Sequence, residues 1–467
     1  MQLTPEQQII LSHVQSNTGI TLVNSVAGSG KTTLLTSIAK AISHNNGLYI
    51  CYNNAIAKES KTKFPTTTAC STIHSLAYRA VVPVYKLLVT DFTHRSITEK
   101  LDYDVKVQIV NSIREFCLSS HTDYNKFCTD NDIRKYGIKY LDLMAHGKID
   151  CSHDFYLKFF HILLSSGDIT YKPFDFILLD EAGDVNPVTA AIFELLPSER
   201  KVAVGDQFQN IYSFNHTINY FKTAPSTAVT FDMTQSFRVS NQIAPLIEQF
   251  CQSYMDPKAS FKGVDVSNTT IKSTAIITRT NAALIDYMIQ LNEQGTPYGL
   301  VRPPKEIFRI PLMLCSIKYQ SFISDPTYRH LQEHVDDWHE GTNIREAYKS
   351  PIMYIASLYP DDFQLQQAIR LIVKHGKPLI WDTYNLASAH YSSSQGIMLM
   401  TAHSSKGLEF DHVIIANDLN ESISQVLTDI KSGVPITSIP NQQAELLRLY
   451  YVACSRARVK LSNANQL

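Results

Sequence analysis

A glycine-rich stretch at residues 25–33 has the residue types and spacing that bind a nucleotide phosphate. It reads SVAGSGKTT, between an apolar run at 20–23 and a helix-patterned run at 34–39. Glycines let consecutive backbone N–H groups point at phosphate oxygens, and the start of a helix adds its positive dipole end. Lys31 is suited to neutralise the β- and γ-phosphates, and Thr32 to ligate Mg²⁺. Ser25 stands where the strict pattern has its first glycine, so an ordinary surface turn is the alternative.

Two carboxylates and a glutamine supply a second group of chemically capable side chains. Asp180 and Glu181 directly follow the apolar run 176–179. We expect Asp180 to hold Mg²⁺ through water and Glu181 to polarise the attacking water. The alternative for this pair is a cap on the next helix. Gln209 lies on the loop after a second apolar strand run, where an amide can sense a γ-phosphate or the water that attacks it.

Two aromatic residues, Tyr212 and Phe214, come shortly after that glutamine. Aromatics two residues apart are more often part of a core. Their neighbourhood here favours base stacking, which contributes about 1–3 kcal/mol per base.

The elements that would position these residues follow a βαβα rhythm, which indicates a parallel sheet covered by helices. A first helix is predicted over 3–16, with Thr4 as its N-cap and Pro5 at its first position. Further helices are predicted over 55–63, 282–292 and 442–452. The strand-like runs lie at 20–23, 47–52, 67–70, 176–180, 201–206, 275–278, 397–400 and 412–415. A second α/β unit is expected to begin near Met233.

Composition narrows the class of protein. The chain has 467 residues, 44% of them hydrophobic and 18% charged, with a formal net charge of −1. A nucleic-acid partner would therefore need a local groove, because there is no global basic field. The eight cysteines form no CxxC pair, which argues against a zinc site and favours free thiols in a reducing compartment. No signal peptide or membrane-spanning run is apparent, so we expect a soluble, cytoplasmic-type protein.

A series of short motifs runs along both halves of the chain: LTPEQ at 3–7, AGSGKT at 27–32, TIH at 72–74, DEA at 180–182, VGD at 204–206 with Gln209, QSFR at 235–238, TAHSSKGLEF at 401–410 and LYYVACSRA at 449–457. In this order the motifs resemble those of the UvrD/Rep-like superfamily 1A DNA helicases. The match is most specific at His403–Phe410, which reads HSSKGLEF. Compact insertions and the stretch at 72–78 look most like the F-box DNA helicases and small phage-encoded helicases.

This resemblance implies an α/β fold with two RecA-like parallel-sheet P-loop NTPase cores, each with a mainly helical insertion. Core 1A is expected at 1–79 and 161–232, and core 2A at 233–298 and 391–467. The helical insertion 1B would occupy 80–160, and the small insertion 2B would occupy 299–390.

For the nucleotide, the resemblance implies ATP and Mg²⁺. Gln7 would read the adenine edge, Phe237 would stack on adenine, and Glu409 would accept from the ribose hydroxyl. Arg238 and Arg456 would clamp the γ-phosphate from the second core. The implied catalytic residues are Lys31, Asp180, Glu181, Gln209, Arg238 and Arg456, with Thr32 and Asp180 at the metal. The implied nucleotide contacts are Gln7, Ala27, Gly28, Ser29, Gly30, Lys31, Thr32, Thr33, Phe237, Arg238, Glu409 and Arg456.

For DNA, the resemblance implies stacking platforms and backbone contacts spread over both cores. The stacking residues would be Tyr52, Tyr212 and Phe214. The remaining DNA contacts would be Thr72, His74, Arg279, Asn281, His403 and Lys406.

Three positions depart from the family pattern. Gly183 stands where a glutamine usually links the ATP and DNA sites, Phe214 replaces a tryptophan, and Thr33 replaces an arginine. The glutamine link is therefore missing or moved.

The expected function is an ATP-dependent helicase or translocase on single-stranded DNA. The family implies 3′-to-5′ travel and the unwinding or remodelling of duplex or branched DNA in replication, recombination or repair. One alternative is a translocase that displaces proteins or migrates branches with little unwinding, and another is an ATP-gated nucleic-acid-binding regulatory module. The expected partners are single-stranded DNA, single-strand/duplex junctions and replication or recombination proteins, with no membrane. We expect a monomer in a bacterial or phage-infected cytoplasm, or in the nucleus of a eukaryote.

Overall fold

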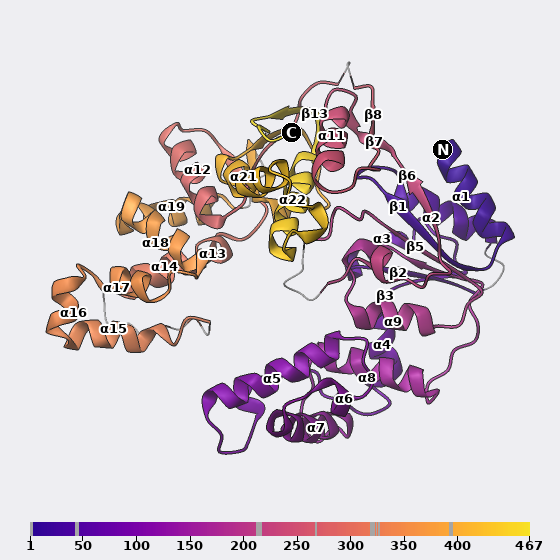
Figure 1. Ribbon diagram of the computed structural model, residues 1–467, viewed down its shortest axis with the longest axis horizontal. Helices are drawn as coiled ribbons and strands as arrows, with labels where there is room; N and C mark the ends of the chain where they lie inside the picture. The colour runs from indigo at the N-terminus through magenta and orange to yellow at the C-terminus, as the bar shows by residue number, and fades with distance from the viewer. Residues whose placement is uncertain are drawn as a thin grey trace. The chain divides into compact units, whose positions relative to one another are not determined.

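The chain folds into two compact units, Met1–Phe237 and Arg238–Leu467, in a computed structural model (Figure 1). The structure describes residues 3–42, 46–211, 217–266, 269–317, 323, 325, 327–391 and 396–467. Each unit is built around one parallel sheet, so the predicted α/β class with two parallel-sheet cores is confirmed.

The first unit contains a six-stranded parallel sheet in the order β3-β2-β4-β5-β1-β6. Because all strands are parallel, their carboxyl ends meet at one edge, where the chemically capable residues follow them. The strands are β1 (Gly19–Ser25), β2 (Gly47–Cys51), β3 (Thr68–Thr72), β4 (Phe176–Leu179), β5 (Arg200–Gly205) and β6 (Val229–Met233).

Helices cover both faces of this sheet because successive strand residues point to opposite sides. Leu22 packs into one buried cluster and its neighbour Val23 into the other, and Ile177 and Leu178 divide in the same way. The helices around the strands are α1 (Pro5–Ser16), α2 (Lys31–Ile42), α3 (Asn54–Ser60), α4 (Ile73–Val81), η2 (Ala182–Asp184), α9 (Pro187–Leu195) and α10 (Tyr220–Thr223).

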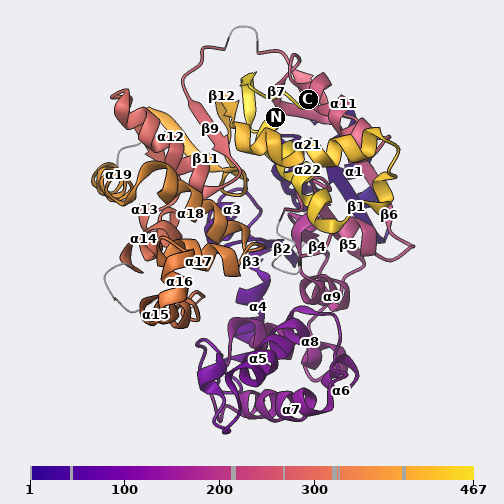
Figure 2. The ribbon, with the colours of Figure 1, turned by 60° about the vertical axis from the view of Figure 1, so that its left-hand side comes forward.

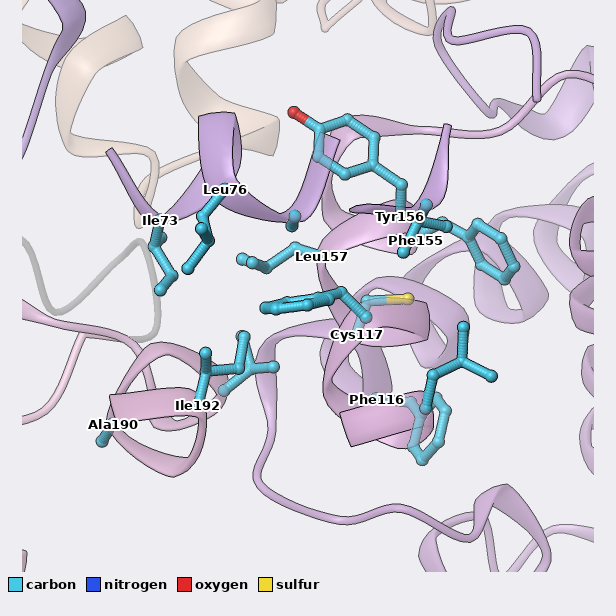
Figure 3. Close-up of a cluster of buried hydrophobic side chains, with 14 of the residues drawn as sticks. Ile73, Leu76, Phe116, Cys117, Phe155, Tyr156, Leu157, Ala190 and Ile192 are labelled. Carbon is cyan, nitrogen blue, oxygen red and sulfur yellow. The ribbon is translucent and has the colours of Figure 1, made fainter. Parts of the chain in front are cut away.

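A helical group inserted between β3 and β4 packs against α4 and α9 (Figure 1). Its core is continuous with one face of the sheet. Figure 3 shows Leu157 of the insertion beside Leu76 of α4, and Phe116, Cys117 and Ile192 belong to the same buried cluster. The group contains η1 (His94–Ser96), α5 (Tyr103–Leu118), α6 (Tyr124–Phe127), α7 (Asn131–Ala145) and α8 (His153–Ser166).

The second unit has a five-stranded parallel sheet in the order β10-β11-β9-β12-β13, and Figure 2 shows β9 beside β11. A two-stranded ribbon of β7 and β8 accompanies it. The strands are β7 (Gln235–Ser240), β8 (Lys262–Val264), β9 (Thr274–Thr278), β10 (Tyr298–Leu300), β11 (Ile397–Thr401), β12 (Phe410–Ile415) and β13 (Ala457–Ser462).

In the second unit, one large buried cluster joins the sheet to helices between β10 and β11. The helices of this unit are α11 (Ala244–Tyr254), α12 (Asn281–Glu293), α13 (Pro304–Ile307), α14 (Arg309–Ser316), α15 (Leu331–Glu340), α16 (Thr342–Ala347), α17 (Pro351–Leu358), α18 (Phe363–His375), α19 (Lys377–His390), α20 (Ala402–Ser405), α21 (Asn417–Lys431), η5 (Ile436–Ser438) and α22 (Asn441–Cys454).

The predicted strands and helices are present within a few residues of their expected bounds, and Thr4 caps α1 as predicted. The sequence did not predict β6, which pairs with β1 in the first sheet and ends at Met233. The second compact unit begins at Arg238. Four of the five residues of β6 are not fully buried, so it lacks the continuous apolar run of a central strand.

All eight cysteines are free thiols and buried. Within the described ranges, none of the helices combines the length and the apolar character needed to cross a membrane.

Candidate nucleotide and DNA sites

The glycine-rich loop lies between β1 and α2, as predicted. Gly28 and Gly30 have φ of +76° and +82°, a region that side chains other than glycine rarely adopt. Ser25, which replaces the first glycine of the strict pattern, is buried and donates from its hydroxyl to the backbone carbonyl of Gly205 at 2.9 Å. This serine therefore ties the end of β1 to the end of β5.

The predicted phosphate-binding lysine is paired with the predicted catalytic acid. Lys31 Nζ lies 3.3 Å from Glu181 Oε1. Burial alone lowers the pKa of Lys31, but the nearby carboxylates of Glu181, Asp180 and Asp206 raise it overall. The lysine is thus held as a cation at the carboxyl edge of the sheet, where anionic phosphate would replace the carboxylate as its partner.

Asp180 is fixed by neighbours on both oxygens. Oδ2 accepts from the Tyr49 hydroxyl at 2.7 Å, and Oδ1 accepts from the backbone N–H of Glu181 at 2.9 Å. Burial and the charge of Glu181 raise the pKa of Asp180, while Lys31 and the tyrosine hydrogen bond act in the opposite direction. Glu181 itself has φ of +55°, a strained value for a residue with a side chain.

The two residues predicted to contact adenine meet at Gly30. The Gln7 amide nitrogen lies 3.3 Å from the carbonyl oxygen of Ser29 and 3.4 Å from that of Gly30, while its amide oxygen accepts from the backbone N–H of Thr4. A Cβ on Gly30 would sit 3.7 Å from the Phe237 ring. The backbone N–H of Phe237 donates to the Gly28 carbonyl at 2.8 Å, so Phe237, the last residue of the first unit, lies beside the loop.

The loop has the features that a nucleoside triphosphate requires. Ser29 Oγ is buried and has no hydrogen-bond partner within the part of the chain that the structure describes. Thr32 is exposed at the start of α2, where its hydroxyl is accessible to a metal ion. Together with Lys31 and the positive-φ glycines, these residues fit ATP with Mg²⁺.

The loop after β5 brings Gln209 to the same edge. Its amide nitrogen donates to Asp206 Oδ2 at 2.8 Å, and Asp206 is itself one of the acids that raise the Lys31 pKa. Asn210 is buried and donates to the backbone carbonyl of Gly183 at 2.6 Å. The predicted stacking residues Tyr212 and Phe214 lie outside the described residues.

The DNA contacts predicted in the first unit follow β2 and β3, which are neighbours in the sheet. Tyr52 is 63% exposed, as a stacking platform must be. Thr72 caps α4 by accepting from the backbone N–H of Ser75 at 3.1 Å. His74 lies on the first turn of α4.

His74 is held from the helical insertion. Its Nδ1 lies 3.3 Å from the Tyr156 hydroxyl, which is also 3.2 Å from His153 Nδ1. In Figure 3 this hydroxyl points away from the other labelled side chains of the apolar cluster. Burial lowers the pKa of His74, and the charge of Asp154 partly offsets that effect.

In the second unit, the predicted γ-phosphate arginines and the predicted ribose acceptor form one group. Arg238 Nε donates to Glu409 Oε2 at 2.7 Å. Arg456 is 1% exposed and donates from Nη1 to the Leu408 carbonyl at 3.3 Å and from Nε to the Val452 carbonyl at 2.9 Å. The segment 408–409 therefore connects the two arginines.

The DNA contacts predicted in the second unit follow the neighbouring strands β9 and β11, where Thr278 is in register with Thr401. Arg279 and Asn281 come after β9. His403 and Lys406 come after β11, and His403 Nε2 lies 3.8 Å from a carboxylate oxygen of Glu445.

Arg279 also lines a groove of about 500 Å³ between α12, α18, α21 and α22. Its guanidinium lies 5.2 Å from the centroid of the Phe363 ring, and its Nη1 is buried without a hydrogen-bond partner among the described residues. The groove has charges of both signs: it is lined by Arg370 and Lys374 and by acidic side chains, and Lys374 Nζ lies 3.0 Å from Asp286 Oδ1.

Sequence reasoning missed several residues that complete these sites. Tyr49 donates a hydrogen bond to Asp180, and the charge of Asp206 raises the pKa of Lys31. The Tyr156 hydroxyl lies beside His74, and Asn210 donates to the Gly183 carbonyl. Only Asp206 carried a signal in the sequence, as a polar residue directly after an apolar strand. The other three act through pairings with residues at least 27 positions away.

A glycine-rich phosphate loop and an acidic pair at the edge of one parallel sheet, followed in the chain by a second parallel-sheet unit, fit a two-core P-loop NTPase. Two family models match the chain: the AAA domain over residues 7–215 and the UvrD-like helicase C-terminal domain over residues 377–463. Together with the curated relatives, these matches support an ATP-hydrolysing helicase of the UvrD-like superfamily 1.

Curated relatives match along nearly the whole chain. "F-box DNA helicase 1" of Gallus gallus is 25% identical over 514 aligned residues, which cover 98% of this chain and 48% of the relative. "F-box DNA helicase protein 1" of Schizosaccharomyces pombe is 27% identical over 526 residues, covering 98% of this chain and 57% of the relative. The chain thus spans about half the length of these relatives.

Proposed function

We propose that this protein is an ATP-driven motor that moves on single-stranded DNA, 3′ to 5′, and unwinds or remodels duplex or branched DNA. The observation that carries the proposal is the cluster of Lys31, Asp180, Glu181 and Gln209 at one sheet edge, flanked by Gln7 and Phe237. The names of the curated relatives support DNA as the substrate.

In the proposed hydrolysis step, the loop amides and Lys31 bind the phosphates of ATP. Phosphate displaces Glu181 from its ion pair with Lys31, which frees that carboxylate to accept a proton from the attacking water. Thr32 and Asp180 would hold Mg²⁺, which supplies charge neutralisation at the phosphates. Tyr49 keeps the Asp180 carboxylate oriented.

We further propose that Arg238 and Arg456 contact the γ-phosphate and that Glu409 accepts from the ribose. Arg238 and Glu409 form an ion pair with each other. When nucleotide binds, this ion pair would be replaced by a contact from Arg238 to the γ-phosphate and a contact from Glu409 to the ribose. Arg456 is preorganised by two backbone carbonyls, which lowers the entropy cost of placing its guanidinium.

The DNA path is proposed to use Tyr52, Thr72 and His74 in the first unit and Arg279, Asn281, His403 and Lys406 in the second. Stacking on exposed aromatics and contacts to phosphates suit single strands of any sequence. The helical insertions at 80–160 and 299–390 are proposed to contact duplex DNA or replication and recombination proteins, with the chain acting as a monomer. We propose that it works where DNA is processed, in the cytoplasm of a bacterium or the nucleus of a eukaryote.

The direct test is ATP hydrolysis with and without single-stranded DNA. We expect strong stimulation by DNA in the wild-type chain and its loss in Lys31→Ala. Arg238→Ala should retain nucleotide binding but lose stimulated turnover. A stimulated rate that survives Lys31→Ala would show that the assignment is wrong.

A second candidate is an ATP-gated DNA-binding module with slow turnover, which Gly183 favours because the usual glutamine is absent. DNA-stimulated turnover of many ATP molecules per second would exclude it. A translocase that displaces proteins without efficient unwinding is separated from a helicase by comparing strand separation with protein displacement at equal ATP consumption.

A further inference from the structure

A short segment at residues 233–237, which we name the strap, is hydrogen-bonded to the phosphate loop and ends at Phe237. The bonds reach consecutive residues of the loop, and one of them comes from the fully buried hydroxyl of Ser236. They run from the Val26 N–H to the Met233 carbonyl at 3.1 Å, from the Ser236 hydroxyl to the Ala27 carbonyl at 2.7 Å and from the Phe237 N–H to the Gly28 carbonyl at 2.8 Å. The backbone that carries Phe237 is therefore fixed relative to the loop.

The first turn of α1 holds the strap from a second direction. Both carboxylate oxygens of Glu6 bind Thr234: Oε2 accepts from its backbone N–H at 2.9 Å, and Oε1 accepts from its hydroxyl at 2.6 Å. The amide nitrogen of the next residue, Gln7, donates to the carbonyls of Ser29 and Gly30 in the phosphate loop. Neighbouring side chains of one helical turn thus connect the strap and the loop.

These contacts fix the relative position of the two residues proposed to bind adenine. Gln7 is carried by α1, and Phe237 is carried by the strap. Phe237 is more than half exposed, so packing does little to hold its ring. The position of the ring depends mainly on the backbone, which Glu6 anchors three residues earlier, at Thr234. Glu6 binds the strap and is not among the residues proposed to touch nucleotide.

We propose that Glu6 is a positioning residue that strengthens binding of the adenine base by anchoring the strap to α1. This inference rests on the proposed function, in which Gln7 and Phe237 contact adenine. Glu6 and Thr234 are partly buried, so water takes the place of the carboxylate when it is removed, and the fold is kept. A water molecule does not tie the strap to the helix, so the bound base must then order the strap itself, which costs affinity.

The test measures the binding of ADP and of inorganic tripolyphosphate by calorimetry, with the thermal midpoint of each variant. The variants are Glu6→Ala, Thr234→Val and the combination of both. Tripolyphosphate reports on the phosphate loop alone, and Thr234→Val removes the hydroxyl while keeping the shape of the side chain. Glu99→Ala is the matched control, because the Glu99 carboxylate likewise accepts from two partners, Lys139 and Tyr140, in the helical insertion.

For Glu6→Ala we expect about a tenfold higher dissociation constant for ADP, as for the loss of a hydrogen bond to a charged group, and an unchanged constant for tripolyphosphate. Thr234→Val should weaken ADP binding by about threefold, because the N–H of residue 234 still binds Glu6. The double variant should bind ADP as Glu6→Ala does, since both changes break the same contact. Glu99→Ala should leave both dissociation constants unchanged.

Unchanged ADP affinity in a folded Glu6→Ala variant would overturn the inference. Equal weakening of ADP and tripolyphosphate would also overturn it, because the defect would then lie in the phosphate loop. So would effects of the two single variants that add fully in the double variant. If Glu6→Ala does not fold, Thr234→Val decides the question by the same comparison. Failure of the proposed function is distinct, because it would appear as wild-type ATP hydrolysis that DNA does not stimulate, whereas ADP binding is measured without DNA.

Discussion

Phe237 provides a quantitative test of where the nucleotide base binds. Its side chain is 54% exposed, and its ring borders the Gly30 position of the phosphate loop. The proposed contact is a stack on adenine, and removal of an aromatic platform costs about 1–3 kcal/mol per base. At 1.4 kcal/mol per factor of ten, Phe237→Ala should raise the KM for ATP by roughly 5- to 150-fold.

The structure predicts that this effect arises from lost stacking and not from unfolding. Phe237 is already more than half exposed, so little apolar burial is lost on truncation. The hydrogen bond from the Phe237 backbone N–H to the Gly28 carbonyl does not involve the side chain. Phe237→Tyr keeps an aromatic ring and should retain a KM near the wild-type value.

The assay is DNA-stimulated ATP turnover over a range of ATP concentrations, with inhibition by inorganic tripolyphosphate as a second measurement. Tripolyphosphate has no base, so its inhibition constant should be the same for wild type and Phe237→Ala. Tyr103→Ala is the matched control, because Tyr103 is 60% exposed on α5, in the helical insertion. An unchanged KM for ATP, or equal weakening of ATP and tripolyphosphate, would refute base stacking at Phe237.

Three further variants test other contacts. Tyr156→Phe removes the hydroxyl that lies beside both His74 and His153. The binding free energy for single-stranded DNA, measured by fluorescence anisotropy, should weaken by about 1 kcal/mol. Unchanged affinity would contradict a role for this contact in DNA binding. Ser25→Ala leaves the Gly205 carbonyl without its buried donor. The free energy of unfolding, measured by denaturant titration, should fall by about 1–2 kcal/mol. An unchanged free energy of unfolding would show that this hydrogen bond does not stabilise the fold. Lys158 is fully buried and donates to the carbonyls of Ser119 and His121, and burial lowers its pKa from 10.5 to about 8. The unfolded chain therefore binds more protons than the folded chain between pH 8 and 10.5, so the stability of wild type relative to Lys158→Met should rise by roughly 3 kcal/mol across that range. A constant difference would contradict the lowered pKa of Lys158.

The sequence predicted those features that depend on local order. β1, β4 and β5 are apolar runs that end in the phosphate loop, in Asp180-Glu181 and at Asp206, and parallel strands bring such ends to one edge. The Thr4 cap of α1 was predicted because its signal spans only a few residues. The strand β6 was not predicted, because its pattern of partly exposed residues lacks a continuous apolar run.

Long-range contacts could not be predicted in the same way. The departure at Gly183 was visible in the sequence, but its cause is the approach of the Asp206 backbone, which depends on how two loops pack. The hydrogen bond from Asn210 to Gly183 joins residues 27 positions apart. The contact between the Tyr156 hydroxyl and His74 joins residues 82 positions apart. The residues of a motif can be read from local patterns, whereas their partners depend on the tertiary fold.

The account depends most on ATP hydrolysis driving movement along single-stranded DNA. The direct measurement is strand separation on matched duplexes with a 3′ tail, a 5′ tail or no tail, each with ATP or a non-hydrolysable analogue, for wild type and Lys31→Ala. We predict ATP-dependent separation of the 3′-tailed duplex by the wild-type chain, little on the other two substrates, and none by Lys31→Ala. Wild-type protein that hydrolyses ATP yet neither separates strands nor displaces a bound protein from any of these substrates would contradict the account.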